Sequence, residues 1–96
     1  MPTIGYIIRA DLRKHLGDPP GESRTCLVLP PPEFTQSYAA AAEKAFDLAV
    51  AALHEQTRSP VIEETSHRMV FVEDLRPFRN SLILEKDGWK CFGVHG

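Results

Sequence analysis

The strongest hydrophobic pattern in the chain predicts one long helix over residues 37–56. Eight of the nine alanines fall within residues 39–52, and alanine favours helices because it loses no side-chain rotamer freedom there. Either Thr35 or Ser37 is expected to cap the start, since the prolines before them cannot enter a helix interior. Pro60 sets the end, because the residue before a proline is steered away from helical geometry.

At about 100° per residue, this helix has a broad apolar face and a narrow polar strip. The apolar face carries small and bulky side chains: Tyr38, Ala42, Ala45, Phe46, Ala49, Ala52 and Leu53. Glu43 and Asp47 lie one turn apart on the polar strip and repel each other by roughly 0.2–0.5 kcal/mol. A basic partner would relieve that repulsion, whereas a solvated helix face needs no partner, and both interpretations stay open.

Alternating apolar and polar positions predict strands on both sides of the helix. The segments that read as strands are residues 3–10, 24–29 and 68–75 and the two halves of 80–95. Asp87 and Gly88 separate those halves and favour a tight hairpin turn, because both turn positions need positive φ. The turn predicts the cross-strand pairs Leu84–Cys91 and Ile83–Phe92.

Two connections are harder to assign. Residues 11–17 fit either a short helical turn or the end of the first strand. Residues 58–67 read as a loop, with room for a short edge strand at Val61 and Ile62.

The order of these elements predicts an α+β fold in a single domain over residues 1–96. A chain of 96 residues supports one core rather than two. The expected order is strand–strand–helix–strand–strand–strand, and the short connections favour a mainly antiparallel sheet of four or five strands. One long helix covers one face of that sheet. The other face, with side chains such as Ile7, is only partly polar and is a candidate interaction surface or dimer interface.

Composition and charge narrow the function. The chain is 43% hydrophobic and 25% charged, as ordinary globular proteins are, which argues against disorder. Its net charge of -2 argues against general polyanion binding. A local basic patch of Arg9, Arg13, Lys14 and Arg24 would still suit nucleic acid or an acidic protein surface, unless these side chains are simply a solvated hairpin end.

Motifs for catalysis, cofactors and metals are missing from the sequence. There is no nucleophile motif, phosphate-binding loop or dinucleotide fingerprint, so we expect no enzyme and no cofactor. Glu63 and Glu64 precede His67, and a Glu–His pair there could act as acid and base, although acids in a loop are usually just solvated. The four histidines are His15, His54, His67 and His95, and none has metal-site spacing, so no metal is expected.

The two cysteines, Cys26 and Cys91, lie in apolar strand-like segments. We interpret them as buried, reduced thiols, while a disulfide between neighbouring strands stays an alternative. No signal-peptide pattern is present, and no apolar run reaches the roughly 20 residues that span a bilayer. These observations predict a cytoplasmic protein without membrane association.

Three stretches between residues 4 and 60 follow a familiar order. Residues 6–8 belong to an early strand, residues 29–36 form a proline-containing turn, and residues 42–45 lie in the alanine-rich helix. In this the chain resembles the HicB-type antitoxins, from which it departs by its Gly/Pro loop at 17–21 and by lacking an appended DNA-binding segment. Small phage-encoded inhibitors of bacterial defence systems also use one-helix, small-sheet folds. Both comparisons concern the fold, and fold alone does not determine function.

The sequence therefore leads to a non-enzymatic protein-binding module that regulates or inhibits a partner protein, antitoxin-like or phage-inhibitor-like. Its partner is another protein, and a homodimer is one form of this. The residues proposed for partner binding are Arg9, Arg13, Lys14, Arg24, Glu43 and Asp47. Two alternatives stay open: a nucleic-acid-binding protein that uses the basic residues, and a small-ligand-binding or enzyme subunit with a deep pocket beside His67.

Overall fold

A computed structural model describes residues 3–19, 21–32, 37–58 and 61–94 and shows an α+β fold. Five strands form one sheet in the order β3-β1-β2-β5-β4, and every neighbouring pair is antiparallel. The elements are β1 (Thr3–Arg13), β2 (Glu22–Leu29), α1 (Tyr38–Thr57), β3 (Val61–Val72), the short helix η1 (Arg76–Ser81), β4 (Leu82–Lys86) and β5 (Trp89–Val94). The predicted fold class and element order are confirmed, with η1 as an addition.

Helix α1 begins and ends near the predicted residues. Ser37 is the N-cap, and its hydroxyl accepts a hydrogen bond from the backbone N–H of Ala40 at 3.3 Å. The alternative cap, Thr35, lies outside the described residues. Arg58 ends the helix in the left-handed conformation, with φ at 58°, and donates its backbone N–H to the His54 carbonyl at 2.9 Å. The cap is thus set by Arg58, two residues before Pro60.

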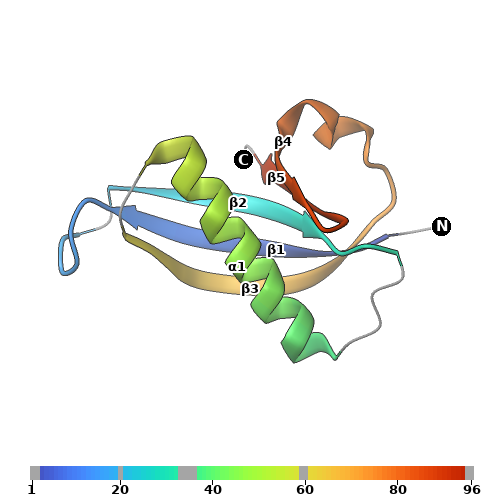
Figure 1. Cartoon of the computed structure of the whole chain (residues 1–96), viewed down its shortest axis with the longest axis horizontal. Helices are drawn as coiled ribbons and strands as arrows, with labels where there is room; N and C mark the ends of the chain where they lie inside the picture. The colour runs from blue at the N-terminus through green and yellow to red at the C-terminus, as the bar shows by residue number, and fades with distance from the viewer. Residues whose placement is uncertain (1–2, 20, 33–36, 59–60, 95–96) are drawn as a thin grey trace.

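The main core lies between α1 and the sheet. Helix α1 crosses one face of the sheet diagonally (Figure 1). Its buried side chains are mostly small: Ala41, Ala45, Leu48, Ala49, Ala52 and Leu53. Because alanine is short, the helix backbone approaches the sheet closely, and the larger side chains of the core come from the strands. These include Tyr6, Ile8, Val28 and Trp89.

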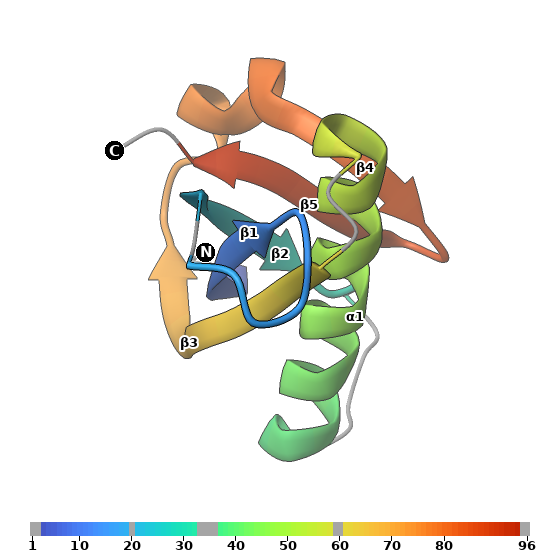
Figure 2. The same cartoon turned by 90° about the vertical axis from the view of Figure 1, so that its left-hand side faces the viewer.

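The opposite face of the sheet is partly covered by the chain itself. Leu27, Leu29 and Phe92 form a second buried cluster there. Leu75 and Phe78, from the connection between β3 and β4, pack against this cluster, and the Phe78 and Phe92 rings meet edge to face at 6.3 Å. The expectation that this face is free as an interaction surface or dimer interface is therefore wrong over β2 and β5, because the β3–β4 connection folds back across them (Figure 2).

Strand β3 is longer than the sequence predicted. It runs continuously from Val61 to Val72, so the segment 58–67 is mostly strand rather than loop. The cause lies in β1, which extends to Arg13, so that residues 11–13 belong to the strand and not to a helical turn. That extra length pairs with the first half of β3, with Arg13 opposite Val61 and Thr3 opposite Val72 at the two ends. The pairing shifts once at a β-bulge, where Thr65 is the extra residue.

The hairpin of β4 and β5 is confirmed. Asp87 and Gly88 have φ values of 53° and 85°, as the predicted turn requires. Leu84 lies opposite Cys91 as expected. Phe92, however, lies opposite Leu82 rather than Ile83, because an irregularity between Leu82 and Leu84 shifts the register.

Candidate functional site

The longer free edge of the described sheet is the outer side of β3. This strand is the last in the sheet and pairs with β1 alone among the described strands. It is 12 residues long, whereas β4 at the other edge has only 5. A long edge strand presents a row of unpaired N–H and C=O groups to which another strand can add. Edge length therefore singles out β3 as the place where this fold can accept a partner.

Exposed apolar side chains follow the same edge. Met69 is 44% exposed and Phe71 is 65% exposed. Ile4, which lies on β1 directly opposite Phe71, is 43% exposed. We name these three residues the edge patch. Met69 lies opposite the buried Tyr6, so the patch is on the face that α1 packs against. It remains exposed at the end of the sheet near the start of β1. Contiguous apolar surface of this kind is typical of protein-binding sites.

The β-bulge in β3 places an acid beside a histidine. Glu64 lies opposite Ala10 and His67 opposite Ile8, so both side chains face α1. Glu64 Oε1 and His67 Nδ1 are 2.5 Å apart. The His67 ring also lies 6.2 Å from the ring of Tyr38, measured between centroids. The structure thus brings Glu64 rather than Glu63 to His67, and both residues belong to a strand rather than to a loop.

An open groove of about 370 Å³ runs between α1 and β3 at this pair. Its described lining consists of Tyr38, Ala39, Ala42, Glu43, Phe46, Glu64 and His67. None of these residues is a serine, cysteine or threonine that His67 could activate as a nucleophile. The groove places acidic and aromatic side chains next to the β3 edge.

The four basic candidates are divided between the two faces of the sheet. Arg24 lies opposite Ala10, whose side chain is buried under α1, while Arg9 is one position along β1 and faces the other way. Arg13 is engaged by Glu63 at 3.1 Å. Lys14 is exposed just after β1. The structure therefore does not gather these side chains into one patch.

The two acidic candidates on α1 line neighbouring grooves. Glu43 borders the groove of Glu64 and His67, on the side of β3. Asp47 borders a separate groove of about 260 Å³ that also includes Lys86 and Trp89, on the side of β4 and β5. Glu43 alone of the predicted partner-binding residues thus lies beside the β3 edge on the face of α1.

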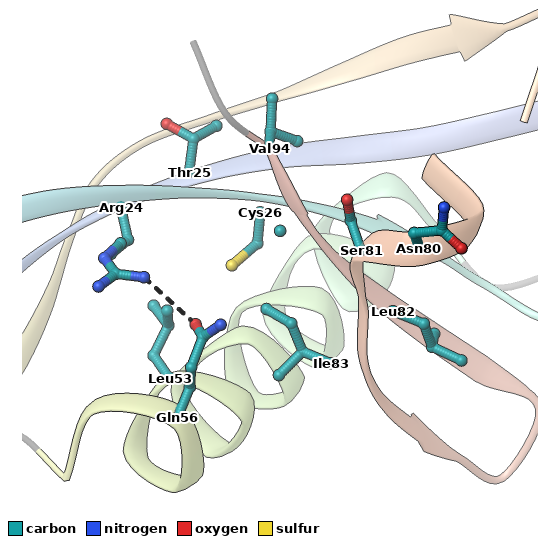
Figure 3. A pocket seen from close by; sticks show the side chains of 11 residues that line it. Arg24, Thr25, Cys26, Leu53, Gln56, Asn80, Ser81, Leu82, Ile83 and Val94 are labelled. Carbon is teal, nitrogen blue, oxygen red and sulfur yellow. Dashed lines mark hydrogen bonds between the residues drawn. The ribbon is translucent and has the colours of Figure 1, made fainter. Parts of the chain in front are cut away.

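A third hollow, of about 200 Å³, lies between the end of α1 and the strands β2, β4 and β5 (Figure 3). Arg24 lies at its rim, within 3.3 Å of Glu22 Oε1 and 3.5 Å of Gln56 Oε1. Leu53 and Ile83 form apolar walls. The Glu22 carboxylate and the Gln56 amide oxygen already engage the Arg24 guanidinium. Arg24 is therefore less available to an anionic partner than the sequence suggests.

The two cysteines are free and buried, as predicted. They occupy diagonal positions on adjacent strands, because Val28 lies opposite Cys91 and Gly93 lies opposite Cys26. The Cys91 thiol donates a hydrogen bond to the Cys26 sulfur, which lowers the pKa of Cys26. The same hydrogen bond, together with burial, raises the pKa of Cys91. The pair is a packed part of the core.

Sequence reasoning missed the edge patch because it did not anticipate β3 as a single strand. The signal that could have found it is the β-branched content of residues 61–65, which continues the strand pattern of residues 68–75 backwards. Met69 and Phe71 then fall on one face of an edge strand rather than in the middle of a sheet.

Two further findings concern metals and membranes. In the part of the chain that the structure describes, no three His, Cys, Asp or Glu side chains are grouped so as to hold a metal ion. The described helices include none with the length and apolar content needed to cross a bilayer.

Comparison with known proteins finds no matching family model, no similar curated protein and no similar solved structure.

Proposed function

We propose that this chain is a small, non-enzymatic protein-binding module of the cytoplasm that regulates or inhibits a partner protein through strand β3. The observation that carries the proposal is the 12-residue edge strand, whose outer side no described strand pairs with and whose Met69 and Phe71 side chains are exposed. Edge strands are commonly protected by a covering element, a proline, charged side chains or a β-bulge. Strand β3 carries acidic residues and a bulge in its first half, but its second half exposes Met69 and Phe71. Its exposure is accounted for if another protein covers it.

The binding mode that fits is strand addition. An extended segment of the partner pairs with β3, and its main-chain hydrogen bonds supply affinity. Specificity comes from the side chains that flank the edge. On the face of α1 these are the edge patch and the groove with Glu43, Glu64 and His67. A partner strand with an apolar residue near Met69 and a basic residue near Glu43 satisfies both.

Such a module acts by occlusion. A partner whose own functional strand is sequestered on β3 loses access to its target, which is how an antitoxin-like or phage-inhibitor-like protein would work. Occlusion of a partner requires no catalytic residue. The described lining of the groove beside His67 contains no serine, cysteine or threonine nucleophile, which is consistent with this role. The division of Arg9, Arg13 and Arg24 between faces and ion pairs gives less support to a nucleic-acid partner.

Substitution of Met69 by lysine is expected to weaken partner binding at least tenfold, because the new charge must be buried against an apolar side chain of the partner. Leu16→Lys is the matched control: it is the same kind of change at a side chain that is 81% exposed, in the β1–β2 loop rather than at β3. The partner is isolated with tagged wild-type chain, and affinities are then measured by calorimetry with purified proteins.

Circular dichroism checks that both variants keep the wild-type fold, which the 44% exposure of Met69 leads us to expect. Equal affinities for wild type and Met69→Lys would place the binding surface elsewhere. The proposal would lose its basis if wild-type protein showed neither a partner nor self-association.

A further inference from the structure

The sequence of β3 is self-complementary: the side chains of its first half match, in reverse order, those of its second half in polarity and are opposite in charge. Residues 61–70 read Val-Ile-Glu-Glu-Thr-Ser-His-Arg-Met-Val. From the midpoint between Thr65 and Ser66, each half proceeds through one hydroxyl residue, two charged or ionisable residues and two apolar residues. The first half is acidic where the second half is basic. A strand with this pattern complements an antiparallel copy of itself.

We propose that the partner of β3 is a second copy of this chain, paired antiparallel about a two-fold axis that passes between Thr65 and Ser66. The two five-stranded sheets then join into one continuous sheet through their β3 edges. The inference rests on the proposed role of β3 as a protein-binding edge and adds that in the free chain a second copy occupies this edge, in a defined register, so that a regulated partner must displace it.

In this register every side chain meets one of matching chemistry. Glu64 lies opposite His67 of the second copy, and Glu63 lies opposite Arg68. Beyond them, Ile62 meets Met69 and Val61 meets Val70. Because the axis is two-fold, each of these pairs occurs twice. Cross-strand pairs of opposite charge and of apolar side chains each stabilise a sheet by about 0.2–1 kcal/mol.

The β-bulge is what makes this register possible. In a regular strand, two residues whose numbers differ by an odd amount point to opposite faces. Glu64 and His67 differ by three, yet both face α1, because the extra residue Thr65 shifts the alternation between them. Likewise Glu63 and Arg68 both face away from α1, since they lie opposite Asp11 and Ile7. All four pairs therefore have their two side chains on the same face of the joined sheet.

The ion pairs within one chain do not prevent this pairing between two chains. Arg68 is exposed and makes no ion pair with any described residue. Glu63 and Glu64 are engaged by Arg13 and His67 respectively, and each carboxylate has further acceptor sites for the second copy. A register centred on Arg68 would instead bring two like charges face to face, which destabilises a sheet.

The placement of α1 also fits a second copy. The first turns of this helix extend past β3, as both views of the fold show (Figures 1 and 2). Tyr38 in the first turn is 47% exposed, and Ala39 is exposed beside it. These turns project over the space that the β3 strand of the second copy would occupy, while the Tyr38 ring lies against His67 of its own chain, 6.2 Å away between centroids.

Charge exchange across the axis tests the register. Arg68→Glu places two acids against each other at both Glu63 positions and is expected to raise the dimer dissociation constant about tenfold or more in sedimentation equilibrium. The exchanged variant Glu63→Arg/Arg68→Glu restores opposite charges across the axis but gives up the Arg13–Glu63 ion pair within each chain, so it is expected to recover part of the affinity. Arg79→Glu, an exposed arginine of η1, is the control that alters net charge equally without touching β3.

Cysteine cross-linking gives an independent readout. Ile62→Cys/Met69→Cys is expected to form a covalent dimer under mild oxidation, because these positions meet across the axis on one face. Ile62→Cys/Phe71→Cys, displaced by one pair along the same face, is expected to cross-link far less. A dimer that ignores the charge exchange and cross-links both variants equally would overturn the register. A wild-type chain that stays monomeric but binds another protein through Met69 would overturn the dimer and leave the proposed function intact.

Discussion

Replacement of Ile8 by alanine is expected to lower the free energy of unfolding by about 2–5 kcal/mol. Ile8 is 1% exposed and lies in the middle of the sheet, between Cys26 on β2 and His67 on β3. Its side chain packs in the cluster beneath the alanines of α1. Those alanines are too short to move into the space that the substitution leaves, so we expect a cavity that collapses little. Urea denaturation followed by circular dichroism measures the change.

Ile4→Ala provides the matched control, since it removes the same atoms from the same strand and the same face. Ile4 is 43% exposed, and its truncation is expected to cost less than about 1.5 kcal/mol. Equal losses for the two variants would contradict the placement of the core beneath α1 at Ile8.

The second large effect is expected at Gly5, where alanine should lower the free energy of unfolding by about 1–3 kcal/mol. A Cβ atom added there would lie 2.8 Å from Leu29 Cδ2 and 3.0 Å from Leu27 Cδ1. Both leucines are buried in the cluster that Leu75 and Phe78 cover, so their methyl groups have little room to move. The cost of overpacking is therefore expected to exceed the entropy gained by removing a glycine.

Gly21→Ala is the comparison, because a Cβ atom there meets only the Leu12 carbonyl at 3.6 Å. We expect it to change stability by less than about 1 kcal/mol, in either direction. Thermal unfolding of both variants measures the difference. If Gly5→Ala were as stable as Gly21→Ala, the packing of the second cluster against β1 would be looser than described.

The sequence predicted the elements whose signals are local. The alanine-rich segment and Ser37 specify α1, because propensity and capping act within a few residues. Asp87 and Gly88 specify the β4–β5 hairpin for the same reason. Both predictions rest on residues whose side chains favour one backbone conformation at their own position and at the next few positions.

Strand β3 and the covered face could not be predicted in this way. Residues 61–67 contain two acids and a histidine, and they become strand only because β1 extends to Arg13 and pairs with them. Phe78 covers Phe92 only because the β3–β4 connection folds back over β5. These are long-range contacts, and the periodicity of one segment carries no information on them. The candidate site was missed for this reason, although Glu43 and His67 proved to border it.

The proposed function depends most on β3 being an edge that binds protein. Amide hydrogen exchange, measured on wild-type chain from micromolar to millimolar concentration, tests this directly, because strand addition engages backbone N–H groups that the isolated chain leaves to solvent. We predict that exchange slows with concentration in β3, over residues 61–70, and stays constant in β4 at the other edge. Exchange in β3 that is independent of concentration and of added partner, or slowing confined to β4, would contradict the account.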